Sequence, residues 1–157
     1  MKKFLALILT ALMLVSVFAA CGSSAPPKDL TESYLKGKWE AKFGMEELFG
    51  GSLEDLGIDG SIDAKMIMNL DFKGDGKVIM SLDESSVNKC FDELADAVKD
   101  TEFKEYIDTM KEQIAEELED EGEYTMDGNS VEIEDAVFNY ADGKLTSDDM
   151  PFTFEKK

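Results

Sequence analysis

Short segments in which apolar and polar residues alternate recur through most of this sequence. The clearest one places large apolar residues at every second position, Met66, Met68, Leu70 and Phe72, and the pattern resumes over residues 78–82. Residues 73–76, Lys-Gly-Asp-Gly, lie between the two segments and are typical of a tight turn. Because successive side chains of a strand point to opposite faces, this pattern predicts a β-hairpin with one apolar face.

Strand patterns of the same kind occur six more times. They cover residues 37–43, 123–126, 130–133, 137–140, 144–146 and 150–155. Asp-Gly pairs separate several of these segments, as expected for hairpin turns. Short strands joined mostly by tight turns predict a mainly β fold. We expect an antiparallel meander that curls into a barrel or half barrel over residues 30–157.

Helical patterns occur in two places. Asp29, with Glu32 three positions later, predicts a short helix that Asp29 caps and that ends at Gly37. Apolar residues then recur at spacings of three and four between residues 87 and 118, which predicts two amphipathic helices, or one helix bent at Asp100. Gly122 suits a helix C-terminus, so we expect a helical insertion over residues 87–122, with the acidic run 116–123 at its end.

The start of the chain has the pattern of an export signal. Lys2 and Lys3 precede an apolar run, and the small residues Ala19 and Ala20 come directly before Cys21. Residues 1–20 are therefore interpreted as a signal peptide, and the small residues at its end argue against an uncleaved anchor helix. The sequence around Cys21 resembles the lipobox of bacterial lipoproteins. This resemblance implies acylation of the Cys21 sulfur, membrane attachment outside the cytoplasm, and a flexible tether over residues 21–29.

Charge and composition exclude several classes of function. From Cys21 onward the chain has 14 lysines and 35 acidic residues, a formal charge of −21, and the whole sequence has no arginine or histidine. Such a chain would repel nucleic acid. It also lacks the usual general base and the commonest zinc ligand, so we expect no metal, no cofactor and no enzymatic activity. Catalysis by carboxylates or lysines stays open, although no spacing singles out a pair. Cys90, left without a partner, is expected to be buried.

Several motifs together resemble the lipocalin-like domains of small bacterial lipoproteins. Gly37-Lys38-Trp39 matches the G-x-W triplet of the lipocalin superfamily, and residues 70–78, 124–131 and 152–156 fit the same strand order. The resemblance implies a β-barrel with an apolar pocket, and we expect Trp39 to plug one end. Lipocalins commonly pack an arginine across this tryptophan near the chain's end. Here only Lys156 or Lys157 could stand there, and we expect either to be a poor substitute.

Two functional hypotheses follow. The first is a membrane-anchored, non-enzymatic lipoprotein that holds a small apolar ligand in the barrel. The second is a surface module that contacts a protein partner through its acidic helical insertion. The residues expected to line the pocket, or simply to form the core, are Trp39, Met66, Met68, Leu70, Phe72, Met80, Met126, Phe152 and Phe154. Core packing is the common role of buried methionine, and Phe91, Leu94 and Met110 of the insertion are the residues that could fill the cup.

Overall fold

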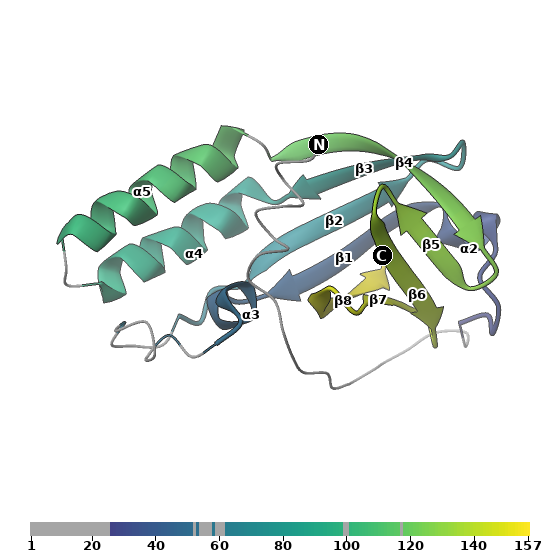
Figure 1. Cartoon of the computed structure of the whole chain (residues 1–157), viewed down its shortest axis with the longest axis horizontal. Coiled ribbons are helices and arrows are strands. Elements are labelled where there is room, and N and C mark those ends of the chain that lie inside the picture. The colour runs from purple at the N-terminus through teal and green to yellow at the C-terminus, as the bar shows by residue number, and fades with distance from the viewer. Residues whose placement is uncertain (1–25, 52, 54–57, 59–61, 99–100, 117) are drawn as a thin grey trace.

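A computed structural model describes residues 26–51, 53, 58, 62–98, 101–116 and 118–157 of the protein (Figure 1). The predicted signal peptide over residues 1–20 and the predicted lipidation site at Cys21 lie outside these described residues. The first described segment, residues 26–30, leads into the short helix α2 (Glu32–Leu35) and then into the sheet.

Eight antiparallel strands form one closed barrel, as the alternating sequence pattern predicted. Each strand pairs with the next one along the chain, and the last strand pairs with the first. The strands are β1 (Gly37–Phe43), β2 (Met66–Phe72), β3 (Lys77–Leu82), β4 (Glu119–Asp127), β5 (Ser130–Ile133), β6 (Ala136–Ala141), β7 (Lys144–Ser147) and β8 (Met150–Lys156). The sheet is therefore a full barrel and not a half barrel, and it has no free edge strand.

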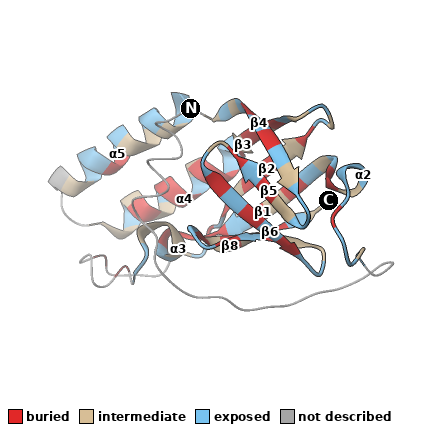
Figure 2. Cartoon of the chain, turned by 45° about the vertical axis from the view of Figure 1, so that its right-hand side comes forward, coloured by how far each residue is buried: buried red, intermediate tan, exposed pale blue. Residues whose placement is uncertain are grey.

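Alternation along the strands sends one set of side chains into the barrel. On β1 the inward residues are Trp39, Ala41 and Phe43, all of them buried, and on β8 they are Met150, Phe152 and Phe154. Figure 2 shows the same change between buried and exposed positions along the strands. The core of the protein therefore lies inside the barrel.

The helices between the strands begin and end at other residues than the sequence suggested. α3 (Met45–Phe49) follows β1, and α4 (Glu84–Ala97) and α5 (Thr101–Glu116) lie side by side between β3 and β4 (Figure 1). Asp83 caps α4, because its carboxylate accepts a hydrogen bond from the Ser86 backbone N–H at 2.8 Å. The expected helical insertion over residues 87–122 is thus two helices within residues 84–116.

Residues 119–123 of the acidic run form part of a strand where the sequence predicted the end of a helix. Residues 119–123 pair with β3, and Lys77 forms an ion pair with Glu121 at 2.7 Å. Glu119, Glu121 and Glu123 are exposed, whereas Gly122 lies between them on the buried face. Alternation, not helix capping, therefore explains this segment: every second residue, each of them a glutamate, points to solvent.

The barrel has two different ends. The turns at 73–76, 128–129 and 142–143 share one end with α2, which we call the Trp39 end. The turns at 134–135 and 148–149 share the opposite end with α3, α4 and α5, which we call the helical end. Figure 1 accordingly places α2 on the opposite side of the barrel from α4 and α5.

Candidate functional site

The residues expected to line a pocket come together inside the barrel. Eight of the nine are buried, and all eight belong to one hydrophobic core; they are Trp39, Met66, Met68, Leu70, Phe72, Met80, Phe152 and Phe154. The ninth, Met126, is half-buried and packs against that core. Eight of the nine residues therefore belong to the buried core.

Aromatic rings contact one another across the interior. Phe43 of β1 stacks on Phe152 of β8, with 4.3 Å between ring centroids and 14° between ring planes. Phe154 then lies edge-on to Phe152 at 5.7 Å and to Phe138 of β6 at 5.8 Å. Because these contacts link three strands, the rings act as packing partners for one another in this part of the barrel.

Helix α4 covers the helical end with its apolar face. Val87, Cys90, Phe91 and Leu94 are buried in the same core as the strand residues. Of the three residues that could fill the cup, Phe91 and Leu94 are each 1% exposed, whereas Met110 on α5 is only half-buried. The spacing of its apolar residues predicted this face of α4, but nothing in the local sequence indicates that the face packs against the barrel.

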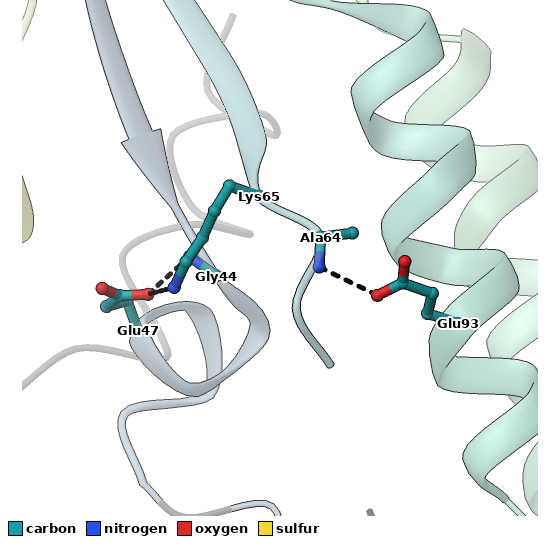
Figure 3. Close-up of polar contacts among 5 residues, drawn as sticks. All are labelled: Gly44, Glu47, Ala64, Lys65 and Glu93. Atoms are coloured by element: carbon teal, nitrogen blue, oxygen red, sulfur yellow. Dashed lines mark hydrogen bonds and ion pairs between the residues drawn. The ribbon is translucent and has the colours of Figure 1, made fainter. Parts of the chain in front are cut away.

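The helical end is also held by polar contacts around the start of β2. The Glu93 carboxylate on α4 accepts a hydrogen bond from the Ala64 N–H at 2.8 Å, and Glu47 on α3 pairs with Lys65 at 3.3 Å (Figure 3). Ser86 Oγ accepts a bond from the Ile67 N–H at 3.0 Å. These contacts fix α3 and α4 to the same strand, so the helical end has a defined geometry.

Cys90 is buried on α4, as predicted. Burial raises the pKa of its thiol to about 11, and the nearby Glu93 carboxylate acts in the same direction. A thiol with so high a pKa stays protonated near neutral pH, and the protonated form is a poor nucleophile and a poor metal ligand. Cys90 therefore serves as a core residue.

A cluster of aromatic and cationic side chains fills the Trp39 end. The Trp39 indole N–H donates to the Leu35 carbonyl oxygen at 2.7 Å, and the Tyr34 and Tyr140 rings lie edge-on to the indole at 5.9 and 6.4 Å. Lys156 lies across the same indole ring. Trp39 is fully buried within this cluster, which joins α2, β1, β6 and β8.

The segment before α2 is bound to this end of the barrel. Tyr140 donates its hydroxyl hydrogen to the Pro27 carbonyl oxygen at 2.7 Å, and the Leu30 N–H donates to the Asn129 side-chain oxygen at 2.8 Å. The cap of α2 is Thr31, whose hydroxyl accepts from the Tyr34 N–H, so the expected cap at Asp29 is wrong. Residues 26–29 of the predicted flexible tether belong to the folded domain.

One buried tyrosine hydroxyl, near α2 and the turn at residues 73–76, is unpaired. Among the described residues, Tyr124 Oη is the only buried side-chain polar atom without a hydrogen-bond partner. Burial raises the pKa of Tyr124, and its ring lies edge-on to Phe72 at 5.0 Å. A buried hydroxyl without a partner loses about 1 to 3 kcal/mol relative to a satisfied one, so this atom is a place where a polar group could bind.

The described residues contain no group of three or more His, Cys, Asp or Glu side chains placed to hold a metal ion. Within the same residues, no helix is both long and apolar enough to cross a membrane. Comparison with protein-family models, with curated proteins and with solved structures found no match to this chain.

Proposed function

We propose that this protein is an exported, non-enzymatic lipoprotein whose barrel presents an acidic helix pair to a partner protein. In this proposal lipid on Cys21 attaches the chain to the membrane outside the cytoplasm, and the barrel is of the lipocalin-like kind. The closed eight-stranded meander, with Trp39 near the start of β1 and Lys156 across it, supports that relationship.

The observation that carries the proposal is the exposed side of α5. Tyr106 is 58% exposed. Among the described positions only two large apolar residues are exposed, and Tyr106 is the more exposed of them. Its ring centroid lies 6.1 Å from that of the half-buried Phe103, and the same helix carries the exposed acids Glu105 and Asp108. An exposed aromatic anchor on an acidic helix suits a partner whose surface has an apolar site near basic residues.

A photoreactive phenylalanine analogue in place of Tyr106 tests this surface in cells that produce the protein. We expect a specific crosslinked adduct at position 106, and we expect Glu105→Lys to reduce its yield because the charge complementarity is lost. Val137 on β6, 45% exposed, is the matched control position, because it is the other exposed large apolar residue in the described part of the chain. Equal adducts at both positions, or none at position 106, would contradict the proposal.

A small apolar ligand with one hydrogen-bonding group is the second candidate. The unpaired Tyr124 hydroxyl, whose ring packs against the apolar, methionine-containing core, favours it. Native mass spectrometry of the purified protein would detect such a ligand as an added mass that Tyr124→Phe weakens. We rank this function second because the interior rings, Phe91 and Leu94 already pack together in one core.

Lipid attachment has its own test. Cys21→Ser should abolish the added lipid mass and either release the protein into the medium or leave an unprocessed precursor. Normal cleavage together with unchanged membrane retention in this variant would contradict acylation of Cys21.

A further inference from the structure

We infer that the barrel stands on the membrane in one orientation, with the Trp39 end toward the lipid surface and the α4–α5 pair away from it. The inference rests on the proposed lipid attachment at Cys21. It assigns a membrane-facing surface to the Trp39 end and leaves the helical end for other partners.

The first support is the way in which residues 26–30, which we call the strap, are bound to the Trp39 end. Besides the bonds from Tyr140 to Pro27 and from Leu30 to Asn129, the Asn129 amide donates to the Lys28 carbonyl oxygen at 3.4 Å. Leu30 is 6% exposed and belongs to the core. Pro26, the first described residue, therefore lies at the Trp39 end.

The second support is the reach of the chain. Five residue steps separate Cys21 from Pro26, which span at most about 17 Å when fully extended. A seven-residue strand such as β2, tilted by about 40° as barrel strands are, gives a barrel roughly 18 Å tall, and α4 and α5 extend beyond it at the helical end (Figure 1). A lipid on Cys21 can thus reach the bilayer directly below the Trp39 end, whereas laying the helical end on the bilayer would require the strap to detach.

The third support is the distribution of charge. Eight lysines balance eight acidic residues in the segments that build the Trp39 end, namely 26–38, 71–77, 123–130, 140–145 and 155–157. At the helical end, α4 and residues 103–116 of α5 hold eight acidic residues and three lysines, and the turns at 134–135 and 148–149 hold four acids and no lysine. An anionic membrane surface repels the helical end and leaves the Trp39 end almost unaffected.

Energy transfer from Trp39, the single tryptophan, to a dansyl headgroup lipid measures the orientation. The chain from Cys21 onward would be coupled through Cys21 to a maleimide lipid in vesicles of phosphatidylcholine and phosphatidylglycerol. The buried thiol of Cys90 does not compete for this coupling. A second chain, Cys21→Ser with Asp148→Cys, would be coupled through the helical end.

Because the height of the barrel, roughly 18 Å, separates the two attachment points, we expect at least about twofold higher transfer for coupling through Cys21. Loosening the strap with Tyr140→Phe and Asn129→Ala should lower the transfer of the Cys21-coupled chain. Circular dichroism would verify that this double variant is folded.

Equal transfer from the two attachments would overturn the orientation, whether or not the loosened variant folds. Unchanged transfer in a folded, loosened variant would overturn the role of the strap. The Cys21→Ser experiment in cells tests natural lipidation separately. The vesicle experiment does not depend on its outcome, because there the lipid is coupled to the protein chemically.

Discussion

The ammonium group of Lys156 lies across the indole ring of Trp39, with 5.4 Å between Nζ and the ring centroid. The same Nζ is 4.9 Å from the Tyr34 ring centroid and donates to the carbonyl oxygens of Tyr34 and Lys36. Burial lowers the pKa of Lys156. A lysine therefore occupies the position across the tryptophan where the lipocalin resemblance implies an arginine, and its flexible stem brings the charge to two backbone carbonyls.

Lys156→Ala should lower the free energy of unfolding by roughly 1 to 3 kcal/mol, because it removes the contact with Trp39 and leaves two carbonyl groups without this donor. Urea unfolding followed by Trp39 fluorescence would measure it. Lys157→Ala is the control. The exposed Lys157 side chain forms an ion pair with Glu40 at 2.7 Å, and we expect its loss to lower the free energy of unfolding by less than about 1 kcal/mol. Equal losses in both variants would contradict a special role for Lys156.

Phe152→Ala should cost about 3 to 5 kcal/mol of unfolding free energy, because the ring is 5% exposed and contacts both Phe43 and Phe154. Val137→Ala, at a 45% exposed position, should change stability by less than about 0.5 kcal/mol. Urea denaturation would compare the two variants. A small loss for Phe152→Ala would show that the interior tolerates a missing ring, which would favour the ligand hypothesis.

The Cys90 thiol should react with iodoacetamide about two orders of magnitude more slowly than an unperturbed thiol near neutral pH. Its pKa of about 11 leaves very little thiolate, and burial blocks access as well. Mass spectrometry of the Cys90 peptide after alkylation, with and without denaturing urea, would measure the ratio. Rapid alkylation of the native protein would mean that α4 opens from the barrel.

Tyr140→Phe should cost about 1 kcal/mol at neutral pH, because the hydroxyl then no longer donates to Pro27. Burial raises the pKa of Tyr140 from 10.0 to about 12. A pKa raised in the folded state means that the stabilisation is complete below about pH 10 and is lost as the pH rises toward 12. Unfolding free energies of both proteins across this range should therefore converge, and a constant difference would contradict the assignment.

The sequence predicted the strands well because each strand is a local pattern. Inward residues such as Met66, Met68 and Phe154 recur at every second position, so burial on one face can be seen without the partner strand. The first half of β4 was the exception. The five acids from Glu116 to Glu121 hid the strand pattern, because Gly122 and Tyr124 are the only buried residues in this strand.

Contacts between distant segments could not be predicted in this way. Leu30 and Asn129 are 99 residues apart, Pro27 and Tyr140 are 113 apart, and Lys156 and Lys36 are 120 apart. None of these pairs has a spacing or motif that connects its members. The strap and the lysine across Trp39 follow from closure of the barrel, which brings the two ends of the chain together.

The hydrogen bond from the Leu82 N–H to the Leu118 carbonyl oxygen, at 2.8 Å, closes the base of the excursion that contains α4 and α5. Joining β3 to β4 across these 35 intervening residues, in place of a three-residue turn, raises the entropic cost of loop closure by about 2 kcal/mol. We therefore expect the tight hairpins to assemble early in folding. The pairing of β3 with β4 should form late, once the two helices have shortened the distance between these strands.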